Sequence, residues 1–301
     1  MALAWAGAVH ADLLRHCAAP PVLDAAQQDR LFRFAALVRD ELAAAGAPAV
    51  LVARAGTDLQ RFGLRHSHAG ISLRASPNTP WSVRQLYDDC DAARPRLFDQ
   101  GLPGFVLGGA SPDEGHVVLW LLPDDAAQAL AAAALDDRRA LALLGGTYSA
   151  NAHAWSTTYQ NCNQWVAELL AAAWGAAASG PDARGQAQRW LRAEGYAPTR
   201  VEVANPLVLL AGAVLPWLHT DDHPPGAVQR GQFDVSLPAS IGAFVQRRFP
   251  ASRRISLCHD RVQMVVRPGW GDDPPVDAGC RAGDGDRVIR FDAAPLPFSG
   301  A

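Results

Sequence analysis

Apolar residues near the start of the chain recur with the spacing of one helix face. The stripe lies within residues 23–45, and Gly46 follows at the position where a helix commonly ends. We therefore predict a long amphipathic helix over residues 23–45. Its apolar face comprises Leu31, Phe32, Phe34, Ala35, Val38 and Leu42.

Short runs rich in β-branched and aromatic residues follow this helix, separated by Gly, Pro, Asn and Asp. Such runs are typical of strands. Their succession without intervening long helices predicts neighbouring strands of one largely antiparallel sheet. The predicted strands are residues 49–53, 67–73, 81–87 and 117–122.

The rest of the chain mixes helical spacing with shorter β-rich runs. A polar, aromatic stretch at 145–159 has the composition of a loop that lines a site. Helices are predicted at residues 124–134, 136–144, 162–174, 182–194 and 238–249. Strands are predicted at residues 255–258, 262–267 and 287–291.

The order of these elements predicts a compact α+β protein, since no internal repeat or low-complexity linker divides the chain. We expect a leader or possible signal peptide at residues 1–20. A core domain follows at 21–223, and a C-terminal extension at 224–301 packs on the same domain.

Composition excludes several classes of protein. The 301 residues include 27 basic and 30 acidic ones, for a net charge of -3, which is too even for a protein that neutralises nucleic-acid phosphates. Every one of those basic residues is Arg, so a P-loop lysine, a Schiff-base lysine and a Ser-Lys dyad are excluded. We expect no nucleic-acid partner and no cofactor.

The cysteines leave two interpretations open. No C-x-x-C pair is present, so neither a zinc ribbon nor a thioredoxin-like motif is available. In an exported protein, two disulfides among Cys17, Cys90, Cys258 and Cys280 would leave Cys162 free. In a cytosolic protein, all five cysteines would be reduced.

The N-terminus bears on the same choice. Residues 2–9 are apolar and lead to Val-His-Ala at 9–11, which resembles the cleavage site of a secretory signal, although the basic n-region is missing. A signal peptide predicts a periplasmic or secreted protein, and an ordinary N-terminal segment a cytoplasmic one. The apolar run 206–218 is shorter than the ~20 residues needed to span a bilayer. We predict buried core there and no transmembrane segment.

The first candidate for chemistry is a strand that carries histidines. Alternation along residues 66–73 places His66, His68, Gly70 and Ser72 on one face. The small residues would let a second element approach His68 closely. The alternative is that His68 is an ordinary hydrogen-bonded histidine in a half-exposed strand.

The second candidate is a cysteine at the start of a helix. Cys162 shares a helix face with Val166, Leu169 and Ala173, and so lies in the first turn on the core side. The N–H groups and the positive dipole end at a helix start favour a thiolate, which is the nucleophilic form. The alternative is a small buried apolar residue that happens to begin a helix.

Together these features resemble papain-like thiol enzymes, in which a Cys at a helix N-terminus faces a His on the adjacent sheet. Because the His precedes the Cys, the order resembles the circularly permuted branch that includes lecithin-retinol acyltransferase-like proteins and NlpC-type cell-wall peptidases. The matching motifs are His68-Ala69-Gly70-Ile71 and Asn161-Cys162. The resemblance implies an antiparallel sheet packed against a Cys-bearing helix. Gln85 takes the third position, where that branch usually has His.

A resemblance to bacterial domain-of-unknown-function family 2145 covers nearly the whole chain. It rests on the segments LVARAG, RHSHAGISL, STTYQNCNQWVAELL, RGQAQRWLRAEGY and DDHP. Members usually begin with a secretion signal and have no established activity. The resemblance therefore implies export and leaves the reaction open.

The site predicts acyl transfer on an amide or ester. His68 would activate Cys162, Gln85 would orient the imidazole, and N–H groups at the helix start would hold the oxyanion. The expected substrate is a cell-envelope peptide or an acyl-containing small molecule, and the alternative is a non-catalytic papain-like binding scaffold. Further oxyanion or substrate-lining candidates are Gln160, Asn161, Tyr159 and His66.

A metal site is a weaker hypothesis. His219, Asp222 and His223 bring imidazole and carboxylate groups together within a short stretch. Pro224 follows immediately, so a helix that would place the two histidines on one face is not expected to continue. We predict a loop with carboxylate–histidine hydrogen bonds and no bound metal.

Overall fold

The computed structural model describes most of the chain between residues 22 and 291. The described ranges are 22–89, 94–109, 111–175, 180–205, 208–209, 215–271 and 273–291. The predicted leader at residues 1–20, the cysteines Cys17 and Cys90, and most of the apolar run 206–218 lie outside them. Within these ranges no helix is long and apolar enough to cross a membrane.

An antiparallel sheet of eight strands forms the centre of the fold, with the order β10-β9-β8-β5-β1-β2-β3-β4. The early strands are β1 (Ala49–Arg54), β2 (His68–Leu73), β3 (Ser82–Asp89), β4 (Arg94–Gln100) and β5 (Gly115–Leu121). The late strands are β8 (Arg253–His259), β9 (Gln263–Pro268) and β10 (Arg287–Arg290). A separate hairpin pairs β6 (Thr199–Glu202) with β7 (Gln232–Val235).

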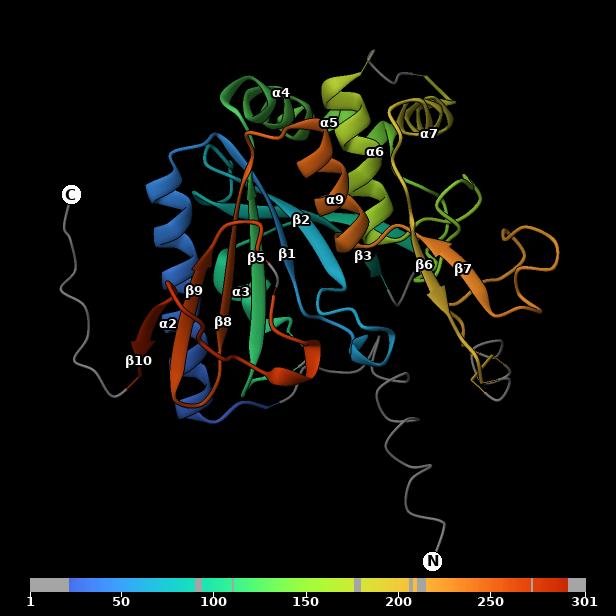
Figure 1. The fold of residues 1–301 in the computed structure, drawn as a ribbon. Helices are drawn as coiled ribbons and strands as arrows, with labels where there is room; N and C mark the ends of the chain where they lie inside the picture. Colours follow the sequence, from blue (N-terminus) through green and yellow to red (C-terminus); the bar gives the residue numbers. More distant parts are fainter. Residues whose placement is uncertain are drawn as a thin grey trace, which may run out of the picture.

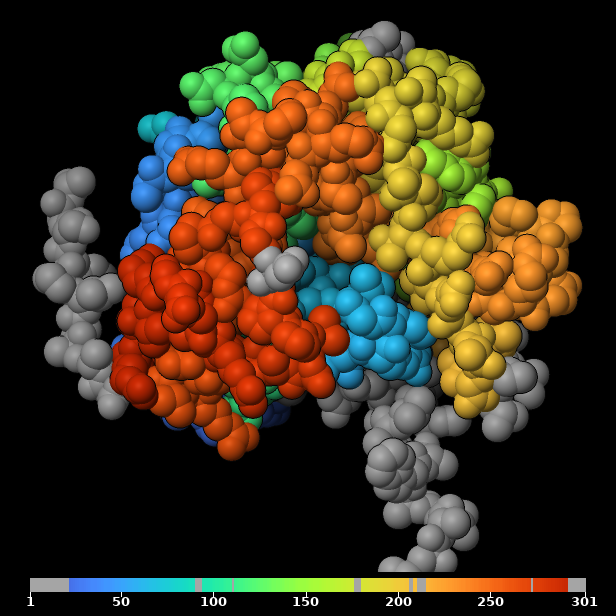
Figure 2. Space-filling view, viewed as in Figure 1, coloured from blue at the N-terminus to red at the C-terminus, as the bar shows by residue number. Residues whose placement is uncertain are grey.

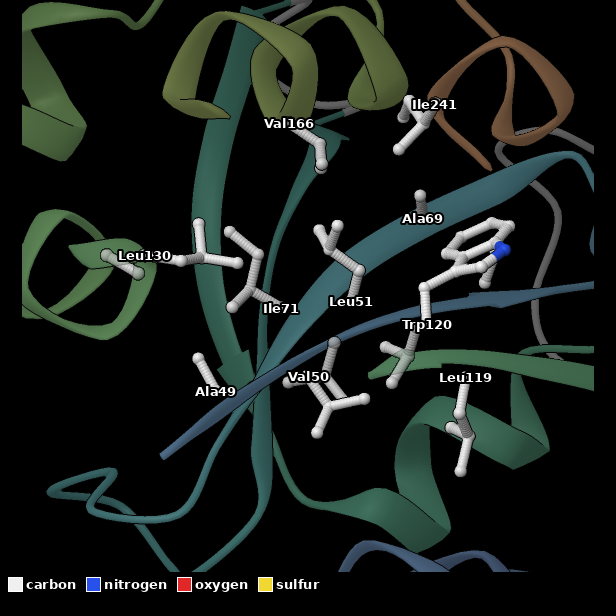
Figure 3. Close-up of a cluster of buried hydrophobic side chains, with 14 of the residues drawn as sticks. Ala49, Val50, Leu51, Ala69, Ile71, Leu119, Trp120, Leu130, Val166 and Ile241 are labelled. Atoms are coloured by element: carbon white, nitrogen blue, oxygen red, sulfur yellow. The ribbon is translucent and has the colours of Figure 1, made fainter. Parts of the chain in front are cut away.

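Helices cover both faces of this sheet. One face packs against α4 (Asp124–Leu135), α6 (Cys162–Trp174) and α9 (Pro238–Arg248), and the other against α2 (Ala25–Ala45) and α3 (Leu102–Leu107). In Figure 3, Leu51 and Ile71 point toward Val166 of α6, whereas Val50 and Leu119 point to the opposite face. This alternation follows from the period of two along a strand. Smaller helices are α5 (Asp137–Ala142), α7 (Ala183–Ala193), η2 (Gln60–Phe62) and η3 (Val276–Ala278).

The α+β class and the antiparallel sheet agree with the sequence prediction, and the bounds of α6 are confirmed. Three strands and one helix were not predicted: β4, β6, β7 and α3. β4 is an edge strand with two arginines and a proline, so it lacks the apolar alternation that marks a half-buried strand. α3 is only 6 residues long and contains Pro103 and Gly104, which have low helix propensity, so its sequence does not indicate a helix.

The C-terminal segment extends the central sheet. β8 pairs along its whole length with β5, and β9 and β10 follow outward (Figure 1). The Cys258–Cys280 disulfide joins β8 to the loop before β10, with 5.5 Å between the two Cα atoms. Residues far apart in sequence therefore share one sheet and one core.

We expect the disulfide to stabilise this half of the sheet. The bond closes a loop with a sequence separation of 22 residues. The double variant Cys258→Ser/Cys280→Ser should lose about 3 kcal/mol of unfolding free energy, because the unfolded chain regains loop entropy. Urea unfolding measures the change. The wild-type protein in a reducing agent should match the variant, and an unchanged urea midpoint would contradict the prediction.

Candidate functional site

The close approach of β2 and β3 builds the first part of the site. Ladder pairing joins residues 71–73 of β2 to residues 82–84 of β3. Next to this ladder, a Cβ on Gly70 would lie 2.5 Å from a methyl group of Val83 and 3.1 Å from the Cβ of Gln85. Only glycine fits at such distances. The gap in the side-chain layer brings Gln85 beside the strand face that carries His68.

A buried hydrogen bond joins these two side chains. Nε2 of His68 lies 2.7 Å from Oε1 of Gln85, and His68 is 7% exposed. Gln85 Nε2 donates to Oε1 of Gln100 on β4 at 2.7 Å, so both ends of the Gln85 amide have a partner in this arrangement. Because the amide oxygen can only accept, the imidazole proton sits on Nε2. In the neutral ring, Nδ1 is then the basic nitrogen.

Aromatic rings fix the plane of the imidazole. The Tyr87 ring stacks on His68 with 4.7 Å between centroids and an angle of 18°. Phe105 of α3 lies on a further side, at 6.3 Å. His68 is thus held by Gln85 at one nitrogen and by rings on its faces, which leaves it little rotational freedom.

Backbone contacts place Cys162 beside the same strand. Asn161 caps α6, since its Oδ1 accepts the N–H of Gln164 at 2.7 Å, and Cys162 opens the helix. The sulfur accepts backbone hydrogen bonds from Asn163, from Cys162 itself and from Ala69, the residue after His68. A second link runs from Asn163 Nδ2 to the carbonyl of Ser67 at 2.9 Å. These contacts bring together two segments that are 93 positions apart in sequence.

The ionisation of Cys162 differs from the sequence expectation. Burial raises the pKa of the thiol to about 11, although the charge of Arg54 and the three backbone hydrogen bonds act in the opposite direction. The side chain has almost no contact with solvent, being 7% exposed. Desolvation therefore outweighs the effect of the helix start, and Cys162 is a neutral thiol at neutral pH.

Gln160 and Asn161 use their polar atoms in structural bonds. Gln160 accepts the N–H of Gly145 at 2.7 Å and donates to Leu143 O at 2.8 Å and to Glu168 at 2.7 Å. The Asn161 amide donates to two carbonyls, at 3.3 and 3.4 Å. Neither amide keeps a spare N–H for an oxyanion. The hydrogen bonds to the sulfur come from backbone N–H groups.

Tyr159 and the predicted metal candidates divide into two groups. The Tyr159 ring stacks on His219 at 4.2 Å, and its hydroxyl donates to Asp221 at 3.0 Å. Asp222 and His223 instead contact His153 and form a second group with it. Because the candidates do not converge, His219 cannot share one ion with Asp222 and His223.

The second group is a buried cluster tied to the backbone. Asp222 accepts the N–H of His153 at 2.9 Å, and His223 Nε2 lies 2.9 Å from the carbonyl of Asn151. The His153 and His223 ring centroids are 5.3 Å apart. Over the part of the chain that the structure describes, no three His, Cys, Asp or Glu side chains are placed to hold a metal ion.

His66, two residues before His68, lines an open cleft. The cleft has a volume of about 850 Å³ and lies between α9, residues 60–66 and residues 270–271 and 273–277. Figure 2 shows the recess between the orange surface of α9 and the light-blue loop. Burial lowers the pKa of His66 to about 3, so its imidazole is neutral. The walls include Arg65, His66, Trp120, Gln246, Trp270 and Asp273.

The sequence analysis missed a buried ion pair that supports the site. Glu168 lies inside α6 with a side chain that is 0% exposed, and it accepts hydrogen bonds from Arg184 and Gln188 of α7 at 2.8 to 3.1 Å. Burial raises the pKa of Glu168, and Arg184 opposes that shift. A charged residue within an otherwise apolar helix was the available signal, since such a residue needs a buried partner.

The fold and the site define an α+β protein with a buried cysteine, histidine and glutamine at the junction of a helix start and an antiparallel sheet. The family model "Uncharacterized protein conserved in bacteria (DUF2145)" matches residues 41–245, more than half of the chain. The chain belongs to this family. No curated protein and no solved structure matches it.

The raised thiol pKa predicts the alkylation behaviour of Cys162. The logarithm of the iodoacetamide rate should keep rising with unit slope from pH 7 to beyond pH 9, because the thiolate fraction grows until about pH 11. Peptide mass mapping identifies the modified site. Urea-unfolded protein is the control and should level off nearer pH 9. A plateau below pH 8 in the folded protein would contradict a raised pKa.

The Glu168–Arg184 pair predicts a large stability effect. Glu168→Gln should lower the unfolding free energy by about 3 to 5 kcal/mol, because Arg184 would remain buried without its counter-charge. Glu194→Gln is the matched control, since it breaks a more exposed pair with Arg248 and should cost about 1 kcal/mol or less. Equal midpoints of the two variants in urea unfolding would contradict the proposed role of burial.

Proposed function

We propose that this protein is a thiol-dependent acyl-transfer enzyme with Cys162 as nucleophile, His68 as general base and Gln85 as the residue that orients the imidazole. One observation carries the proposal. His68 on β2 is bound to Gln85 by a hydrogen bond of 2.7 Å, and the next residue of β2, Ala69, donates its backbone N–H to the Cys162 sulfur. This arrangement supports a circularly permuted papain-like centre.

The chemistry begins from a neutral thiol. As the sulfur attacks a carbonyl carbon, its proton passes to Nδ1 of His68 and the carbonyl electrons move to oxygen. His68 then returns the proton to the leaving amine or alcohol, which gives a thioester on Cys162. Water or an acceptor nucleophile cleaves the thioester and restores the thiol. Serine enzymes activate a hydroxyl far less acidic than this thiol in the same way.

Backbone groups would stabilise the developing oxyanion. The side-chain amides of Gln160 and Asn161 are engaged elsewhere, so this role falls to the N–H groups of Ala69, Cys162 and Asn163 that already surround the sulfur. Fixed dipoles in a buried site need no reorganisation when charge forms.

We place the substrate in the cleft that His66 lines, because the next residue, Ser67, accepts a hydrogen bond from Asn163 at the start of α6. Its volume of about 850 Å³ is large enough for a peptide or an acyl chain. The Cys258–Cys280 disulfide supports a periplasmic or secreted location, where thiols oxidise. A cell-envelope peptide or acyl compound is accordingly the proposed substrate.

A binding scaffold without catalysis is the second candidate. The observation that favours it is the buried Cys162 thiol, whose pKa of about 11 lies above that of an exposed thiol. In that case the cleft alone would carry the function, and the sulfur would have only a packing role.

The two candidates differ in whether Cys162 becomes acylated. The wild type, Cys162→Ala and His68→Asn are incubated with p-nitrophenyl acyl esters and with muropeptides, and intact-mass and peptide mass spectrometry follow the protein. We expect an acyl adduct on Cys162 of the wild type and none in Cys162→Ala. His68→Asn should acylate 10²- to 10⁴-fold more slowly, since it lacks the base.

Turnover that persists in Cys162→Ala would exclude a thioester mechanism. The absence of any adduct on a folded wild type across the panel would favour the scaffold. Circular dichroism of the three proteins shows whether they share one fold, and Cys162→Ser serves as a nearly isosteric check on the cavity left by alanine.

A further inference from the structure

We propose that Arg54 is a positioning residue that provides the buried positive charge for the Cys162 sulfur when it becomes negative. The inference rests on the proposed function and adds a residue to it. Arg54 ends β1 and is the register partner of His68, the first residue of β2. Because Arg54 and His68 are paired across β1 and β2, the sheet places the Arg54 side chain next to that of His68.

The guanidinium is buried without a counter-charge. Arg54 is 5% exposed, and no carboxylate among the described residues forms an ion pair with it. Its two hydrogen bonds go to neutral oxygens, the hydroxyl of Tyr87 at 2.8 Å and the carbonyl of Ala55 at 3.3 Å. Its Nε is enclosed and has no acceptor. An isolated buried cation is costly, so a protein that keeps one has a use for the charge.

The surroundings are shaped to this side chain. A Cβ on Gly56 would lie 2.8 Å from Nη1, and a Cβ on Gly108 would lie 2.6 Å from Nη2. The cation also lies over the ring of Phe105, with Cζ 5.4 Å from its centroid. Two glycines and an aromatic face thus hold the guanidinium in one place, which indicates a built site and not an accidental burial.

A chain of contacts links Arg54 to the reacting groups. Tyr87, which binds Nη2, is the ring that stacks on His68. Among the charges near Cys162, Arg54 is the one that most favours the thiolate. Tyr148, in the loop before α6, also interacts with Cys162, and Tyr87 and Asp88 of β3 interact with Tyr148 in turn.

Gln85 is neutral, so it stabilises neither an imidazolium nor a thiolate by charge. Arg54 would lower the cost of negative charge on the sulfur as the thiol proton moves to His68. The same cation disfavours a lasting imidazolium, which favours return of the proton to the leaving group. Burial makes a negative charge on the sulfur costly, and a fixed cation lowers that cost relative to the same buried site without the cation.

The test uses alkylation of Cys162 and needs no substrate. Iodoacetamide rates at pH 9 are measured for the wild type, Arg54→Gln and Arg54→Lys. We expect Arg54→Gln to react about ten-fold more slowly, which corresponds to a rise of one unit in the pKa of the Cys162 thiol. Arg54→Lys keeps the positive charge and should recover most of the rate. Simple loosening of the fold would expose the thiol and raise the rate, so the sign separates charge from structure.

Tyr87→Phe provides a milder second variant, because it keeps the ring on His68 and removes only the hydroxyl that holds Arg54. It should slow alkylation in the same direction by a smaller factor. Arg267→Gln is the matched control, since Arg267 lies on β9, pairs with Asp286 at 2.6 Å and should leave the rate unchanged.

Unchanged alkylation in both Arg54→Gln and Tyr87→Phe would overturn the role of Arg54. Failure of the wild type to form an acyl adduct would overturn the proposed function alone, because the alkylation rates report the charge at the sulfur in either case. If Arg267→Gln slowed alkylation as much as Arg54→Gln, the effect would be a general loss of positive charge, and the specific role of Arg54 would also be overturned.

Discussion

A carboxylate with no access to solvent, Glu168, fixes the position of the helix that carries Cys162. It accepts hydrogen bonds from Arg184, from Gln188 and from Gln160, and Arg184 in turn donates to carbonyls of the 156–159 loop. A buried charge tolerates few arrangements, because each lost partner costs a large part of the protein's stability. The start of α6, the loop before it and α7 are therefore held in one geometry.

The site differs from a thiolate–imidazolium pair in where its charges lie. Cys162 and the Gln85 amide are neutral, and among charged groups Arg54 on β1 has the largest effect on the thiol. The Cys162 thiol and the His68 imidazole therefore do not start as an ion pair. In the proposed mechanism, charge would develop during attack on a carbonyl and would be met by backbone N–H groups and a guanidinium that are already in place.

The central sheet joins this site to the part of the chain outside the family match. The match ends at residue 245, within α9, yet β8 continues the sheet from β5 and leads to the disulfide at Cys258. Residues 270–271 and 273–277, which follow β9, form one wall of the cleft. The C-terminal segment thus contributes strands to the sheet and a wall to the cleft.

The sequence by itself determined the elements whose periodicity is strong, including the helix at Cys162 and the strand at His68, because apolar spacing reports which face is buried. It also singled out Cys162, His68 and Gln85, two of which meet in a hydrogen bond. Only the tertiary structure decided the thiol's pKa, the structural use of Gln160 and the place of Arg54. Desolvation and partner choice depend on segments distant in sequence, and a local pattern carries no information about them.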